Sequence, residues 1–239
     1  MTQLFYVLKR LYRLFFVRRV SHFIGDSHAD VFWHMEFSPS FFWKINPKIR
    51  VVHGATATGL SNPNSKTKAL PIFKSYIENH VKKNHNVFFQ LGEVDCGFAI
   101  WFRSEKHNLS VNEQLSSALE NYLGLIRCAI RKEANVFVFS AVLPTIKDGQ
   151  VFGEVANLRR DVKANQQERT LLTLEFNKKL SLLLKKESAT FIDFDTSLLD
   201  PKTNVIKEAF LNKDPKNHHL DHDAYGSLIN LVLTEKIKT

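Results

Sequence analysis

The stretch VSHFIGDS, residues 20–27, runs from an apolar, β-rich segment into a glycine, an acid and a hydroxyl. Four more runs share its apolar character: IRVVHG (49–54), NVFFQLG (86–92), NVFVFSAV (135–142) and ATFIDF (189–194). Each run is nearly continuous in apolar residues and does not alternate. This pattern is typical of strands that are covered on both faces in a parallel sheet.

Helical periodicity fills the intervals between these runs. Residues 66–83, 110–132, 166–187 and 222–237 repeat apolar side chains at helical spacing. The alternation of strand and helix predicts an α/β fold, a three-layer α/β/α sandwich with one five-stranded parallel sheet. No internal repeat and no Pro/Gly/Ser linker interrupts the pattern. We therefore expect a single domain over residues 20–239, preceded by a basic segment at residues 1–19.

The composition fits one globular domain of 239 residues, 44% of them hydrophobic. The two cysteines, Cys96 and Cys128, are too few for a disulfide framework and suit a reducing compartment. The sequence has no convincing signal peptide and no uninterrupted apolar run of about 20 residues. We therefore expect a cytoplasmic protein.

The net charge of +9 is concentrated in residues 1–19, which hold five cations and no acid. On a helical wheel, leucine, tyrosine and phenylalanine side chains share one face, and Lys9, Arg10 and Arg13 lie opposite. Such a helix could lie on anionic lipid at the inner face of the membrane. Alternatively, it could pack on the domain or on a second subunit. We find no nucleic-acid motif and expect no nucleic-acid partner; the oligomeric state stays open.

Polar and glycine residues follow the first three predicted strands. In open α/β sheets, ligands bind beyond the carboxyl ends of the strands. The residues there are Gly25-Asp26-Ser27, then His53-Gly54, then Gly92-Glu93-Val94-Asp95. A serine where a strand passes into a helix offers an unpaired backbone N–H and a hydroxyl that could attack a carbonyl. The alternative is that Ser27 only caps the helix.

A base for Ser27 could come from DPKNHHLDHDAYG (214–226), which packs three histidines and three aspartates before the last helix. Imidazole suits proton transfer near neutral pH. His219, followed by the apolar Leu220, is the first candidate, and His218 is the alternative base. The cluster could instead bind a metal ion or be a solvated polar loop. Because cysteine pairs and HExxH spacing are missing, we expect no metal.

The order of these motifs resembles the SGNH (GDSL-like) hydrolase family. The resemblance covers nearly the whole chain and implies a flavodoxin-like sandwich that needs no cofactor. It implies Ser27 as nucleophile and oxyanion donor, and His219 as base. It also implies a second oxyanion donor at Gly54, with Gly59 as a substitute. Gly92 to Asp95 match the family's Gly-x-Asn-Asp block, and Asp26 is expected to hydrogen-bond neighbouring loops.

Two positions depart from the family pattern. The oxyanion asparagine is replaced by Val94, which cannot donate a hydrogen bond. Losing one such donor typically costs about 10²–10³ in rate. The family's aspartate, three residues before its histidine, is Lys216 here. Asp214 could complete a triad only if the loop bulges, so the alternative is a Ser-His dyad.

The resemblance implies a serine esterase or O-acyltransferase, of the deacetylase or acetyltransferase type. We expect a carbohydrate ester as substrate, in a cell-envelope polysaccharide or its precursor. The alternatives are a lipase or thioesterase, and a non-catalytic glycan-binding module with a degenerate oxyanion hole. Trp33, Trp43 and Trp101 could stack on sugars, although tryptophan is commoner in cores.

Overall fold

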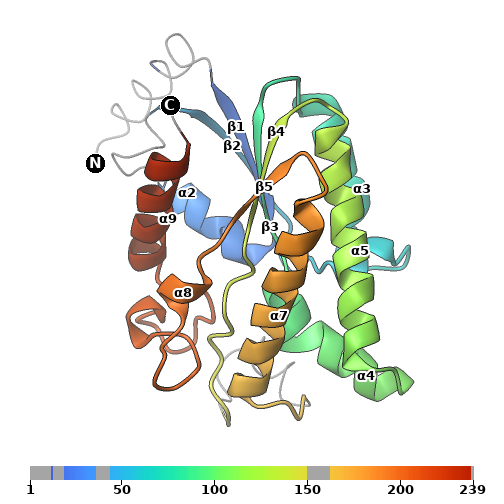
Figure 1. Cartoon of the computed structure of the whole chain (residues 1–239), viewed down its shortest axis with the longest axis vertical. Helices are drawn as coiled ribbons and strands as arrows, with labels where there is room; N and C mark the ends of the chain where they lie inside the picture. The colour runs from blue at the N-terminus through green and yellow to red at the C-terminus, as the bar shows by residue number, and fades with distance from the viewer. Residues whose placement is uncertain (1–11, 13–18, 36–43, 150–161, 238–239) are drawn as a thin grey trace.

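The computed structural model describes residues 12, 19–35, 44–149 and 162–237, and they form a parallel sheet with helices on both faces (Figure 1). The strands are β1 (Val20–Gly25), β2 (Asn46–Val51), β3 (Asn86–Gln90), β4 (Asn135–Phe139) and β5 (Ala189–Ile192). Their order is β2-β1-β3-β4-β5, and all neighbours pair in parallel. This confirms the predicted sandwich. The basic helix predicted for residues 1–19 lies outside the described residues, except for Tyr12 and Arg19.

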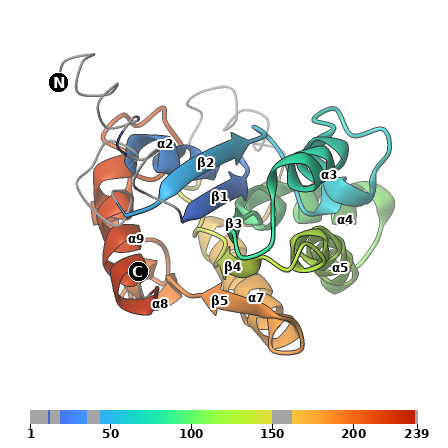
Figure 2. The same cartoon turned by 90° about the horizontal axis from the view of Figure 1, so that it is seen from above.

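Two helical layers cover the sheet, as the view from above shows (Figure 2). One layer contains α3 (Ala69–His80), α4 (Ile100–His107), α5 (Val111–Ile130) and α7 (Gln166–Leu184). The other contains α2 (Val31–Met35), α8 (Asp195–Leu198) and α9 (His222–Lys236). Successive strand residues face opposite layers. Ile24 and Phe89 pack into the first layer's core, whereas Phe23 and Phe88 pack into the second.

The long helices begin where the sequence supplies caps. α5 starts with a capping box of Ser110 and Glu113, and α7 starts with one of Asn165 and Glu168. In each box the side chains satisfy backbone N–H groups that the first turn leaves unpaired. The four helices predicted from periodicity lie within a few residues of their observed bounds, 69–80, 111–130, 166–184 and 222–236, although α3 begins without a side-chain cap.

Strand β2 differs from the prediction. It was expected over residues 49–54 and covered on both faces, but it spans Asn46–Val51 and its residues are half-buried or exposed. The reason is its position, since β2 lies at the edge of the sheet and pairs only with β1. Several short elements lie outside the predicted helices, among them α2, α8, a π-helical turn over Asp95–Ala99 and the helix α4 that follows it.

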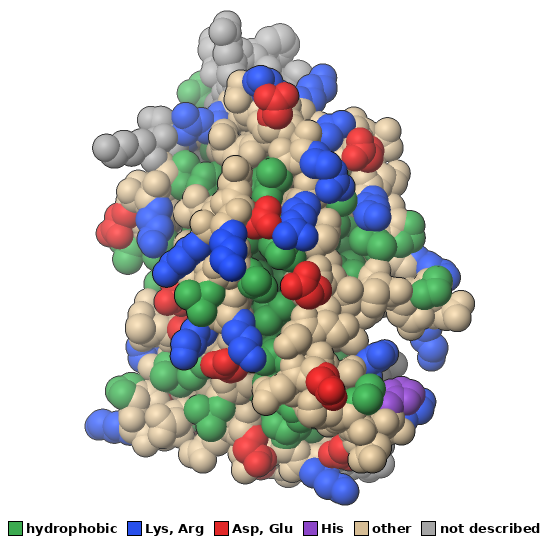
Figure 3. Space-filling model, turned by 45° about the vertical axis from the view of Figure 1, so that its right-hand side comes forward, with side chains coloured by type: hydrophobic (Ala, Val, Ile, Leu, Met, Phe, Trp, Pro, Cys, Tyr) green, Lys and Arg blue, Asp and Glu red, His purple; other side chains and the backbone are tan. Residues whose placement is uncertain are grey.

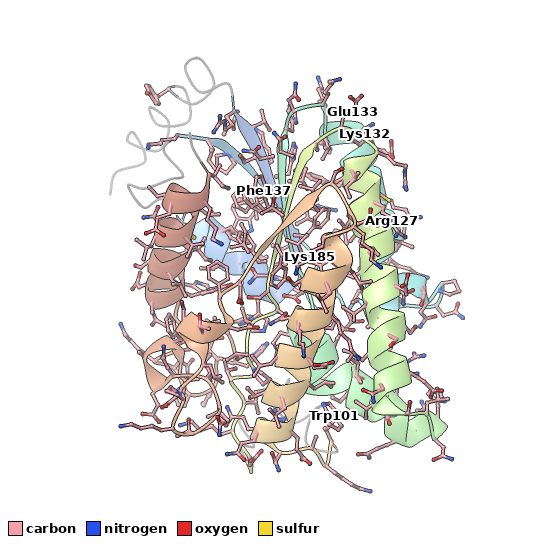
Figure 4. The ribbon with its side chains drawn as sticks, viewed as in Figure 1. Trp101, Arg127, Lys132, Glu133, Phe137 and Lys185 are labelled. Carbon is pink, nitrogen blue, oxygen red and sulfur yellow. The ribbon has the colours of Figure 1, made fainter. Side chains whose placement is uncertain are left out.

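Lysine and arginine side chains gather over the face formed by α5 and α7 (Figure 3). A groove of about 590 Å³ between these helices is lined by Leu119, Leu182 and Leu183 and flanked by lysines. Arg127, which is labelled on α5 in Figure 4, bonds Glu187 just after α7, with 2.7 Å between Nη2 and Oε1. Across the described ranges, no helix combines the length and the apolarity needed to cross a bilayer.

Candidate active site

The turn after β1 requires a glycine because two segments approach each other closely there. A Cβ at Gly25 would lie 2.5 Å from the Gln90 carbonyl oxygen and 2.8 Å from the Ala29 Cβ. The 3₁₀ turn η1 (Ser27–Asp30) can therefore pack against the end of β3 only when residue 25 lacks a side chain. Gly25 thus fixes the position of Ser27 relative to the middle of the sheet.

The backbone around Ser27 leaves one N–H group available. The Asp26 N–H donates to the Gln90 carbonyl at 3.2 Å, and the His28 N–H donates to Asp26 Oδ1 at 2.9 Å. Ser27 lies between these two residues in the chain. Its N–H and its hydroxyl make no hydrogen bond to any described residue, and Ser27 is 9% exposed. This is the arrangement that an oxyanion donor and a nucleophile require.

Asp26 was expected to hydrogen-bond neighbouring loops, but its carboxylate caps its own turn. It is completely buried, and this burial raises its pKa from 3.8 to about 7. The role of holding the neighbouring loop falls to Asp95, which is also buried. Asp95 accepts the N–H groups of Ala57 and Thr58 at 2.7 and 2.8 Å and the Thr58 hydroxyl at 2.6 Å.

Two glycines after β2 were candidates for the second oxyanion donor. The Gly59 N–H donates to Thr56 Oγ1 at 2.8 Å, so it is already used. The exposed Gly54 has a φ of +70°, and its N–H bonds no residue of the described part of the chain. Of the two, Gly54 is therefore the one that could still serve a ligand.

The segment after β3 contains a carboxylate that sequence reasoning did not select. Gly92 itself is required by packing, since a Cβ would lie 2.8 Å from both Ala141 and Phe176. Next to it, Glu93 is 1% exposed, and its Oε2 lies 3.1 Å from Nε2 of His28, which is 4% exposed. The available signal for Glu93 was a charged residue in the short segment just after a buried strand. Its partner, 65 positions earlier, gave no signal in the sequence.

The histidine loop is held in place from two sides. Leu220 is buried and forms an antiparallel bridge with Leu211. The Thr145 hydroxyl, in the segment after β4, donates to the His218 carbonyl. Immediately afterwards, Asp221 caps the first turn of α9. The loop therefore presents its histidines at a fixed position beside η1.

His219 is oriented by Asn217 and not by Asp214. The Asn217 Oδ1 lies 2.8 Å from Nδ1 of His219 and also accepts the His219 backbone N–H at 3.0 Å. The Asp214 carboxylate accepts the Lys216 N–H instead, at 2.9 Å. Because an amide oxygen only accepts, Nδ1 of His219 carries the proton and Nε2 carries the lone pair. This Nε2 is buried and makes no hydrogen bond to any residue that the structure describes.

The environment keeps His219 neutral. Burial, followed by the neighbouring His28 and His218, lowers the pKa of His219 from 6.5 to about 3. The rings of His28 and His219 lie 4.9 Å apart between centroids, and those of His218 and His219 lie 4.1 Å apart. The structure therefore brings both candidate bases to the turn that begins with Ser27. A neutral ring with a buried lone pair can accept a proton or bind a metal ion.

The two described tryptophans differ in how much of the side chain is exposed. Trp33 on α2 is 48% exposed. Trp101 on α4 donates its Nε1–H to the Cys96 carbonyl at 2.8 Å and lies at the end of the molecule where α4 is found (Figure 4). Trp43 lies outside the described residues. Trp33 is therefore the described tryptophan with the most surface to offer.

Comparison with known proteins identifies the fold. No family profile matches the sequence, and no curated protein matches it. Among solved structures, a protein assigned as an acylhydrolase from Bacteroides fragilis matches with a TM-score of 0.56 and 13% identity, over 92% of this chain and 88% of that one. A carbohydrate acetylesterase family member from Sinorhizobium meliloti gives 0.55 and 10%, over 90% and 99%. A GDSL-like lipase from Bacteroides thetaiotaomicron gives 0.51 and 14%, over 92% and 89%.

These likenesses, together with the parallel five-stranded sheet, show that the chain has the fold of the SGNH (GDSL-like) hydrolases. The resemblance seen in the spaced motifs is thereby confirmed at the level of the fold.

Proposed function

We propose that the protein is a serine esterase in which Ser27 is the nucleophile and His219 is the general base. The observation that carries this proposal is the pair of groups left unused at one edge of the sheet. Among the described residues, the Ser27 N–H has no hydrogen-bond partner although both neighbouring N–H groups are bonded, and His219 Nε2 is buried without a hydrogen bond. Because a buried polar atom without a partner destabilises a fold, the unused His219 Nε2 points to a role in binding or proton transfer.

In the proposed reaction, His219 Nε2 accepts the Ser27 hydroxyl proton while the serine oxygen attacks the ester carbonyl carbon. The N–H groups of Ser27 and Gly54 stabilise the oxygen that becomes negative. The intermediate collapses as the imidazolium returns its proton to the departing alcohol, which leaves an acyl-serine. Water, or a sugar hydroxyl in the acyltransferase variant, then attacks the acyl-serine with His219 again as base.

Asn217 replaces the aspartate of a full triad in this proposal. It holds the tautomer of His219 without adding a negative charge, so the imidazolium is stabilised less than in a Ser-His-Asp triad. Val94 supplies no third donor in place of the family's asparagine. We therefore propose modest turnover, below that of a site with three oxyanion donors.

As substrate we propose a small acyl ester of a carbohydrate. One of the proteins that share the fold is a carbohydrate acetylesterase family member, and the half-exposed Trp33 on α2 could stack on a sugar ring. A cell-envelope polysaccharide or its precursor fits the membrane-facing helix expected in residues 1–19. We also propose that this helix places the protein at the inner face of the membrane.

The test uses a fluorophosphonate, which forms a covalent adduct with an activated serine, followed by mass spectrometry of the labelled peptide. We expect one adduct on Ser27, and turnover of an aryl acetate that falls at least about 10³-fold in Ser27→Ala. Activity that decreases with acyl chain length would support an acetylesterase. Activity that increases with chain length would favour the lipase or thioesterase alternative.

Two results would contradict the esterase proposal. If the folded wild-type chain is neither labelled nor active, while it binds glycans saturably, the protein is a binding module. If Ser27→Ala keeps full turnover, the esterase proposal is wrong.

A further inference from the structure

Three imidazoles meet beside the proposed nucleophile. His28 comes from η1, and His218 and His219 come from the loop before α9. One ring nitrogen of each lies within 4.8 Å of the other two. We propose that His28, His218 and His219 together bind one divalent transition-metal ion of the zinc class. This replaces the expectation of no metal, which rested on the absence of linear zinc signatures.

The groups around the imidazoles match those of a metal site. Metal-binding histidines usually bond a carboxylate or carbonyl through the nitrogen that does not hold the ion. His28 has this arrangement, because its Nε2 lies 3.1 Å from the Glu93 carboxylate. His219 has it as well, because its Nδ1 lies 2.8 Å from Asn217 Oδ1. The ion would therefore take Nδ1 of His28 and Nε2 of His219.

The buried position of His219 Nε2 supports the same assignment. Within the described ranges this atom is inaccessible to solvent and makes no hydrogen bond, although such groups are normally paired. His28 and Glu93 are both almost completely buried, so the inner side of the site is built into the domain. His218 and His219 are only half-buried, which leaves a path for an ion from solvent.

The backbone also explains how two successive histidines can share one ion. In an extended segment, adjacent side chains point to opposite sides. Here the Asn217 side chain accepts the His219 N–H and turns the chain, and the two rings lie 4.1 Å apart between centroids. Zinc-bound nitrogens in a tetrahedral site lie roughly 3.4 Å apart. Small side-chain rotations would therefore close the observed cluster around an ion.

The choice of metal follows from the ligands. Imidazole suits zinc, copper and nickel, whereas calcium and magnesium prefer oxygen ligands. Three histidines also leave a fourth position for water, as in open zinc sites. The His219 lone pair cannot hold a metal ion and accept a proton from Ser27 at the same time. Zinc should therefore inhibit any serine-dependent turnover, although the site itself does not depend on the proposed esterase function.

Isothermal titration of the untagged, chelator-treated full chain with zinc chloride tests the proposal. We expect one zinc ion per chain, and no uptake of magnesium at the same concentration. Glu93→Gln should weaken zinc binding by about 10- to 100-fold, because it loses the charged partner of His28. His218→Gln should weaken binding more, and it lies at the half-exposed side where the fold tolerates change.

Two controls make the result specific. His34→Gln removes another surface histidine, which is paired with Asp223 outside the cluster, and should keep wild-type zinc affinity. Ser27→Ala should also keep it, which separates this inference from the esterase proposal. If the wild-type chain takes up no zinc, or if His218→Gln binds zinc as tightly as wild type, the metal site does not exist.

Discussion

Strand β1 has a histidine cluster near each end. Within the described part of the chain, only the cluster at the carboxyl end contains a buried ring nitrogen without a hydrogen bond, His219 Nε2. The amino-edge cluster contains His22, near the start of β1, with Tyr76 on α3 and His85 before β3. The carboxyl-edge cluster contains His28, His218 and His219. Burial lowers the pKa of both His22 and His219 to about 3. A lowered pKa therefore does not by itself distinguish the two.

Hydrogen bonding is what separates them. In the amino-edge cluster, His22 Nδ1 lies 2.9 Å from the Tyr76 hydroxyl and Nε2 lies 2.9 Å from His85 Nδ1. Since the Lys82 N–H also donates to His85 Nδ1, that nitrogen accepts and His22 Nε2 donates. Every nitrogen of His22 is used, so this cluster holds β1, β3 and α3 together. In the carboxyl-edge cluster, His219 Nε2 is left for a ligand.

Removing one histidine from each cluster should have the largest and most different effects. We expect His219→Gln to reduce kcat for an aryl acetate by about 10²–10⁴-fold, because no base then accepts the serine proton. The denaturation midpoint should change little. We expect His22→Gln to do the reverse, lowering the midpoint and leaving kcat within a few-fold of wild type. Steady-state kinetics and urea unfolding of both variants measure the two effects.

The opposite pattern would reassign the clusters. If His218→Gln abolishes turnover and His219→Gln does not, His218 is the base. If His22→Gln loses activity while it remains folded, the amino-edge cluster is functional as well.

A smaller effect should distinguish Asn217 from Asp214. Asn217→Ala removes the acceptor that fixes the His219 tautomer, so we expect kcat to fall on the order of 10-fold with little change in KM. The matched variant Asp214→Ala removes an exposed side chain that only caps Lys216, and should keep wild-type kcat. A loss confined to Asp214→Ala would restore the aspartate triad predicted from the sequence.

The smallest effect concerns pH and stability in the amino-edge cluster. The pKa of His22 is about 3 in the folded chain, lowered by burial and then by His85, His80 and Lys48, against 6.5 for an ordinary histidine. Between these values the unfolded chain binds more protons, so the His22 contribution makes stability fall as pH falls from 6.5 toward 3. We expect His22→Gln to show a smaller drop in urea midpoint between about pH 7 and about pH 4.5 than wild type. An equal drop in both proteins would show that other groups carry the dependence.

Much of the fold could be predicted because it rests on local patterns. The apolar runs located all five strands, and helical periodicity located α3, α5, α7 and α9. The error at β2 arose because an edge strand buries only part of its surface, so its apolar residues extend past its paired part. The run 49–54 therefore overlapped the strand without matching it.

The class of fold and the candidate nucleophile and bases could be predicted from the sequence, because periodicity and the residues at strand ends are local properties. The hydrogen bonds between these residues depend on how distant segments pack. In the folded chain, His28 bonds Glu93 and His219 bonds Asn217 instead of Asp214. Among the described residues, His219 Nε2 has no hydrogen-bond partner. Residues 28 and 219 meet because parallel strands bring distant loops to the same edge of the sheet. The direction of each hydrogen bond there depends on how the loops pack, which no spacing in the sequence records.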